Sequence, residues 1–118
     1  MEKKQANLSF HHSEKFNANL FLLSGALDSL EGMKGERLEG GKEVITGLLD
    51  GLRRQLRISQ NYFPSEKASL IEKGLDDVEA DIRLHQYDNA REKLGKVISC
   101  VATVSNEHIN ILVKEDLI

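Results

Sequence analysis

Three arginines lie close enough in the sequence to form one charged site. Arg53 and Arg57 are four residues apart, and Arg54 and Arg57 are three apart. On a helix such residues share one side, so the spacing predicts a basic patch. A patch of this kind suits a phosphate or another anion, including nucleic acid. The competing interpretation is pairing with the acidic third helix, where Arg53 is expected level with Glu72.

A second candidate site combines His12, Glu66 and His108, which an antiparallel bundle can bring to one end. Imidazole nitrogen and carboxylate oxygen are ligands for zinc, iron and manganese. However, the Glu-x-x-His motif of di-iron bundles is missing from the sequence, and Glu107 directly precedes His108. We therefore predict no metal site and no cofactor, with His108 packed inside the bundle and satisfied by one hydrogen bond.

The single cysteine, Cys100, rules out an internal disulfide and lies among apolar residues. His108 would be roughly 12 Å further along the same helix, too far to act as its base. No Gly-rich phosphate-binding motif and no paired cysteines are present. These observations predict no catalytic residue, and the interpretation leans towards a protein that is not an enzyme.

The length and net charge of the chain limit the number of domains and the classes of protein to which it can belong. The chain has 118 residues, which fits one domain over 1–118, with 1–12 expected as a loosely ordered segment. The net charge of −3 argues against a dedicated non-specific nucleic-acid binder. No stretch approaches the ~18 apolar residues of a membrane span, and no signal peptide is evident, so we expect a cytoplasmic protein.

Four blocks of the chain show helical periodicity. Apolar residues recur at steps of four and three over 13–33, 42–60, from 65 to 82 and after 88, with Ser13 as a candidate N-cap. Short links join the blocks at the glycine-rich 32–41, at Tyr62 to Ser65 and at His85 to Asp88. The pattern predicts an all-α, antiparallel, up-down-up-down four-helix bundle.

The fourth block is the least certain helix by composition, because valine, isoleucine and threonine favour strands. Residues 97–113 carry one formal charge, Glu107, and a hairpin near Ser105 is the alternative. The apolar residues do not alternate, however, and no other strand offers a sheet to join. The periodicity favours a helix that is buried on several sides.

Five glycines fall inside the expected helices, where each costs about 1 kcal/mol relative to alanine. Either another helix approaches closely at these positions, or they are tolerated on a solvent-facing side. The sequence leaves both interpretations open for Gly25, Gly47, Gly51, Gly74 and Gly95.

Apolar residues beside the helical seams suggest a binding surface. Phe21 and Leu22 flank the seam of the first helix, and Ile109 and Leu112 form a second row on the fourth. A bundle needs about one apolar stripe per helix, so these four are expected to bind a partner. The leading prediction is a non-catalytic protein–protein interaction module, most simply a homodimer. The alternatives are a nucleic-acid-associated accessory protein using the arginines and a metal-dependent bundle enzyme.

Overall fold

The computed structural model describes the chain over residues 3–59 and 63–114, with side chains for 10–30, 32–59 and 63–107. Four helices account for nearly all of it: α1 (Lys3–Ser29), α2 (Glu36–Ile58), α3 (Ser65–Arg83) and α4 (Tyr87–Lys114). A short 3-10 turn, η1 (Leu30–Gly32), follows α1. No strand occurs among these residues, so the predicted all-α class is confirmed.

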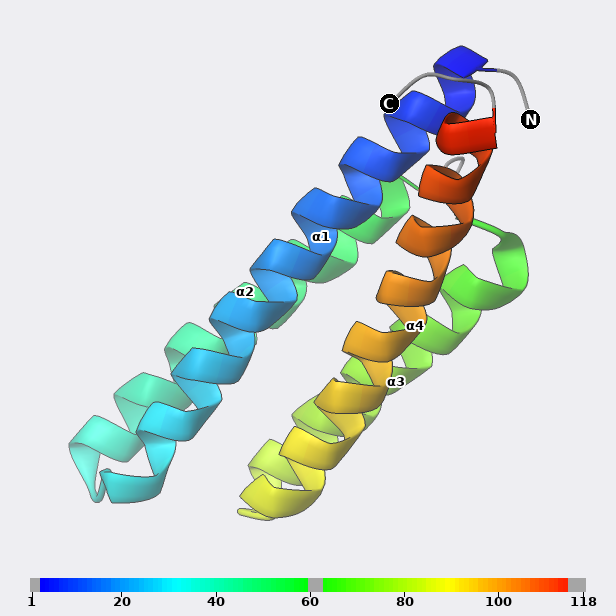
Figure 1. Cartoon of the computed structure of the whole chain (residues 1–118). Coiled ribbons are helices and arrows are strands. Elements are labelled where there is room, and N and C mark those ends of the chain that lie inside the picture. The colour runs from blue at the N-terminus through cyan, green and yellow to red at the C-terminus, as the bar shows by residue number, and fades with distance from the viewer. Residues whose placement is uncertain (1–2, 60–62, 115–118) are drawn as a thin grey trace.

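The helices form an elongated bundle with extents of 53 × 22 × 19 Å. Each helix runs antiparallel to the next, and α4 returns to pack along α1 (Figure 1). The predicted up-down-up-down arrangement of four helices is therefore confirmed. None of the described helices is long and apolar enough to cross a membrane.

The predicted seams form the core. Burying each large apolar side chain is worth ~1.5–3 kcal/mol, which selects the inward face of every helix. The buried seam residues are Phe16, Leu20, Leu23, Leu27, Leu30, Ile45, Leu49, Leu52, Leu56, Ile71, Leu75, Val78, Ile82, Ala90, Leu94, Val97, Val101 and Val104. The fourth block is a helix throughout, so the hairpin alternative is wrong.

The start of α1 differs from the prediction. The helix begins at Lys3, so Ser13 is an internal residue instead of an N-cap, and 3–12 are helical instead of loosely ordered. Ser13 is fully buried and accepts a 2.6 Å hydrogen bond from Ser105 of α4. Because α1 and α4 are antiparallel, this pair sets residues 3–12 level with the end of α4, so α4 does not overhang the bundle.

The start of α2 also differs, since the helix includes Gly40 and Gly41, which were expected in the link. The turn before it rests on Gly35, whose positive φ of 61° favours glycine. Gly41 faces η1, where a Cβ would lie 2.7 Å from Leu30 Cδ2.

After the end of α2, Phe63 is buried with its ring centroid 5.9 Å from that of Phe16. The Tyr62 part of the predicted second link lies outside the described residues.

The helical glycines divide into two groups, so each sequence interpretation holds for some of them. At Gly74 of α3, a Cβ would lie 2.3 Å from Val97 Cγ2 of α4, and the absence of a side chain allows these helices to approach. Gly25, Gly47 and Gly95 have open space beside them, and Gly51 has only an arginine side chain of its own helix at 4.0 Å.

The contact at Gly74 predicts that a glycine-to-alanine substitution there destabilises the protein, although such a substitution inside a helix is usually stabilising. Gly74→Ala should lower the free energy of unfolding by about 1 kcal/mol, because overpacking outweighs the gain in helix propensity. The control Gly95→Ala, with open space, should raise it by about 0.5–1 kcal/mol. Urea unfolding followed by circular dichroism measures both. In a Val97→Ala background the Gly74→Ala penalty should disappear, and a penalty that persists there would contradict the close approach.

Candidate functional site

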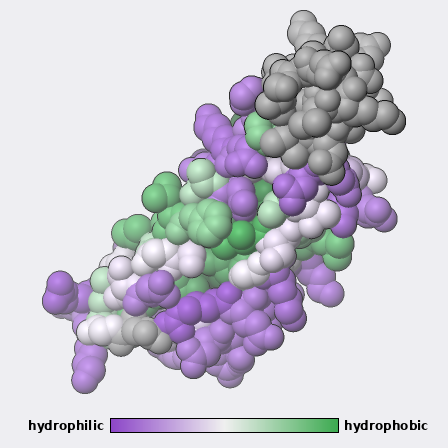
Figure 2. Space-filling model, viewed as in Figure 1, coloured by the Kyte–Doolittle hydropathy of each residue, from purple (hydrophilic) through white to green (hydrophobic). Residues whose placement is uncertain are grey.

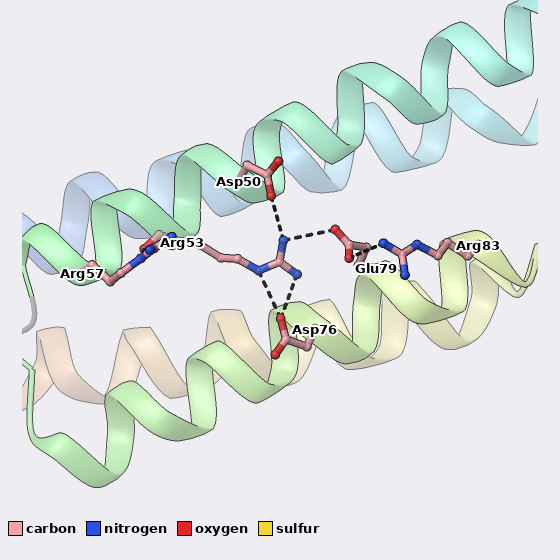
Figure 3. A network of polar contacts seen from close by, with 6 residues as sticks. All are labelled: Asp50, Arg53, Arg57, Asp76, Glu79 and Arg83. Carbon is pink, nitrogen blue, oxygen red and sulfur yellow. Dashed lines mark hydrogen bonds and ion pairs between the residues drawn. The ribbon is translucent and has the colours of Figure 1, made fainter.

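Arg53 lies at the centre of an ion-pair network between α2 and α3 (Figure 3). Its Nη2 donates to Asp76 Oδ1 at 2.8 Å, and its Nη1 donates to Glu79 Oε1 at 3.1 Å. Nη1 also donates to Asp50 Oδ1, one turn earlier on α2, at 3.0 Å. Glu79 accepts a further hydrogen bond from Arg83. The guanidinium fork therefore ties three carboxylates together and fixes the level of α3 against α2.

The surroundings of Arg53 raise its pKa and so favour its charged form. Partial burial acts to lower its pKa, but the hydrogen bonds to Glu79 and Asp76 raise the pKa above its ordinary value. The prediction that Arg53 lies level with Glu72 is wrong. Its partners on α3 are Asp76 and Glu79, which lie four and seven residues further along the helix.

The other two arginines of the predicted patch do not join this network. Arg57 is exposed, and its Nε lies 3.4 Å from the carbonyl oxygen of Arg53. Arg54 is exposed on a different side of α2, beside Ile58 and Lys15 of α1. The three residues therefore do not present one continuous guanidinium surface, and anion binding by Arg54 and Arg57 stays a prediction.

The histidine and glutamate positions are only partly described. His12 Nδ1 lies 3.2 Å from the hydroxyl of Ser59 at the end of α2, and Glu66 is exposed at the start of α3. The side chain of His108 lies outside the described residues. Within the described side chains, no three His, Cys, Asp or Glu residues are grouped closely enough to hold a metal ion.

Cys100 lines a shallow hollow of about 370 Å³ between α3 and α4, with Leu70 and Lys73. The cysteine is half-buried, and this burial raises the pKa of its thiol. A thiol with a raised pKa holds less thiolate near neutral pH and is a weaker nucleophile. The surroundings therefore fit a packing role better than a catalytic one.

One ion pair with a buried carboxylate was not predicted from the sequence. Asp81 of α3 is only 6% exposed and lies 2.7 Å from the ammonium of Lys93 on α4. This hydrogen bond raises the pKa of Lys93. The signal was available, because Asp81 directly precedes the seam residue Ile82, on the flank that faces α4. The pair links α3 to α4 as Arg53 links α2 to α3.

Of the seven large apolar side chains that are exposed in the described part of the chain, five belong to α1 and α2. Phe21 and Leu22 are 60% and 67% exposed, as the sequence indicated for residues outside the seam. Leu22 lies beside Leu48 of α2 along a groove of about 280 Å³ whose floor contains Gly47 and Gly51. Figure 2 shows the face on which α1 and α4 lie in front, with hydrophobic surface along its middle and hydrophilic surface at its borders. The side chains of Ile109 and Leu112 lie outside the described residues.

The α2 half of this surface was not predicted. Val44, Leu48 and Ile58 are exposed, and the stretch 44–49 carries no charge. A helix turns about 100° per residue, which places Leu48 beside the buried seam residue Leu49, on the flank towards α1. The uncharged run was the signal that marks this face.

The arginine network predicts very different costs for two neighbouring substitutions. Arg53→Met should lower the free energy of unfolding by about 1–3 kcal/mol, because it leaves the half-buried Glu79 without its partner on α2. Arg54→Met, on an exposed side chain, should change it by less than about 0.5 kcal/mol. Urea unfolding compares the two, and equal effects would contradict the assigned network.

The raised thiol pKa predicts slow modification of Cys100. Alkylation by iodoacetamide at pH 8 should be slower in the folded chain than in the same chain unfolded in urea, because both burial and thiolate content are unfavourable. Mass spectrometry at timed intervals gives the two rates. A folded-state rate equal to or above the unfolded rate would identify an activated cysteine and overturn the packing assignment.

Comparisons with known proteins add no assignment to this geometry. No family model, no curated protein and no solved structure matches the chain. The features of the chain that bear on function are therefore the bundle, its ion pairs and its exposed apolar face.

Proposed function

We propose that the chain is a non-catalytic protein–protein interaction module whose binding surface is the outer face of α1 and α2. The four helices supply a rigid scaffold, and the exposed apolar side chains supply the contact. Contiguous exposed apolar surface on a small protein marks an interaction site when polar residues surround it. The cytoplasm is the proposed location, since the chain has one cysteine and no possible internal disulfide.

One observation carries the proposal: the middle of α1 is apolar on both its inner and its outer sides. Residues 16–27 contain no charged residue, yet Phe21 and Leu22 point away from the core and are largely exposed. A helix that is apolar all round is normally buried on all sides. Burial of such a side chain in a complex is worth ~1.5–3 kcal/mol, so a partner gains binding energy by covering it.

The polar groups of the described interior support a scaffold role. Arg53 is held by three carboxylates, Asp81 by Lys93, and Ser13 by Ser105. Apart from the pair between Arg53 and Asp50 within α2, each of these contacts joins two helices, so these polar side chains contribute to the packing of the bundle. The groove between α1 and α2 is, in contrast, lined mainly by small and apolar residues.

Affinity capture from the native host tests this function. Leu22→Glu should reduce the recovery of bound protein at least tenfold, because a carboxylate in the contact must be desolvated. Leu70→Glu is the matched control, since Leu70 is 57% exposed on α3 and lies outside the α1–α2 groove. Circular dichroism should show both variants folded. Equal recovery by wild type and Leu22→Glu would contradict the proposed surface.

A further inference from the structure

The groove between α1 and α2 has a distinct distribution of charge along its length. Its centre is apolar, with Leu22, Leu48 and Leu52 around Gly47 and Gly51. Acidic residues lie in the first half of α2, which begins at Glu36 and includes Glu43. Basic residues lie in its second half, where Arg54 lines the hollow that continues the groove. Arg37 and Lys42 also belong to the first half, but they project onto other sides of α2. The side that carries Glu43 and Arg54 therefore runs from negative to positive across an apolar middle.

Glu43 and Arg54 are available for contacts outside the molecule. Both side chains are exposed, and neither forms a hydrogen bond or ion pair within the described part of the chain. At about 100° per residue, the two positions project only about 20° apart around α2, so they lie on the same flank of its exposed stripe. Their neighbour Arg53, in contrast, is fully engaged with α3.

The exposed side of α2 is complementary to the same side of a second α2 that runs in the opposite direction. Gly47 and Gly51 each lie two residues from Leu49, and Gly40 and Ile58 each lie nine residues from it. Glu43 and Arg54 lie six and five residues away, about 8–9 Å along the axis. A second α2 placed antiparallel and level at Leu49 would therefore bring glycine to glycine and acid to base.

We propose that a second copy of this chain occupies the groove, with the two α2 helices antiparallel about a two-fold axis level with Leu49. This inference rests on the proposed function and names its partner. In an antiparallel pair the same flanks of the two helices meet, so Glu43 of each copy pairs with Arg54 of the other. Each ion pair and each apolar contact then occurs twice.

Shape supports the same arrangement. Ile58, the most exposed large apolar residue of α2 at 78%, would lie over Gly40 of the other copy, where a Cβ meets nothing within 4 Å. The hydrogen bond from Asn19 to Gln55 sets Leu22 level with Leu52, next to Gly51, so Leu22 of one copy would lie near Leu48 of the other. The open glycines thus allow the two backbones to approach where their own chain leaves space.

Sedimentation equilibrium measures this association directly. We expect wild type to have twice the 13.2 kDa chain mass at micromolar concentration. Leu48→Glu should be monomeric, because the added carboxylates face an apolar contact, and Leu70→Glu should remain dimeric. A monomeric wild type, or a dimer that Leu48→Glu leaves intact, would overturn the proposal.

Charge reversal tests the antiparallel register. Glu43→Arg and Arg54→Glu should each weaken dimerisation about tenfold, because reversal replaces attraction with repulsion at two symmetric places. The double variant Glu43→Arg, Arg54→Glu should recover the wild-type dissociation constant to within about threefold. The differences should shrink in 1 M salt. Single variants without effect, or a double variant that is not rescued, would contradict this pairing.

The capture experiment separates failure of this inference from failure of the proposed function. A monomeric wild type that still recovers a different protein in a Leu22-dependent manner would refute self-association and leave the interaction module standing. A monomer whose captured proteins do not depend on Leu22 would refute both.

Discussion

The whole structure depends on burial of one apolar seam per helix. Side chains at alternating steps of four and three meet in a common core, and each large one contributes ~1.5–3 kcal/mol when buried. Exposed ion pairs contribute only ~0–1 kcal/mol, so the seams and not the charges decide which side of each helix faces inward. The seams of α1 and α4 form the most extensive of these contacts, because these two helices pack along each other.

Polar contacts then set the level of each helix against its neighbour. A seam of repeating leucines tolerates sliding by one turn, whereas a hydrogen bond between named atoms does not. Arg53 fixes α3 against α2, Lys93 fixes α4 against α3, and Ser13 fixes α1 against α4. The three contacts follow the bundle round from one helix pair to the next.

Much of the fold could be predicted from the sequence, because periodicity reports directly on burial. Helix starts and long-range registers could not, since they depend on partners distant in the chain. Serine is a residue type that is favoured at N-caps, but Ser13 is a buried internal residue that is hydrogen-bonded to Ser105 of α4. Arg53 was correctly expected to pair with α3, yet its partners Asp76 and Glu79 lie about one and two turns beyond the predicted Glu72. The exposure of Phe21 followed from simple helical geometry.

The apolar face of α1 and α2 is the consequence of a bundle that can cover only one stripe per helix. Gly74 offsets its conformational cost by a close contact within the chain, whereas Gly47 and Gly51 have no such contact among the described residues. Each of these two costs about 1 kcal/mol in a helix. The proposed second α2 would account for both, and it would also account for the opposite charges of Glu43 and Arg54 along the exposed side of α2.

Distances between spin labels in the dimer test this account most directly. In a Cys100→Ser background, labels at Thr46→Cys should lie within about 20 Å of each other, because residue 46 is close to the level of the two-fold axis. Labels at Glu36→Cys should lie about 40 Å apart along the helix axis, since residue 36 is 13 positions from Leu49. Pulsed electron paramagnetic resonance reads both distances. Equal distances at the two sites, or a longer one at residue 46, would contradict antiparallel pairing through α2.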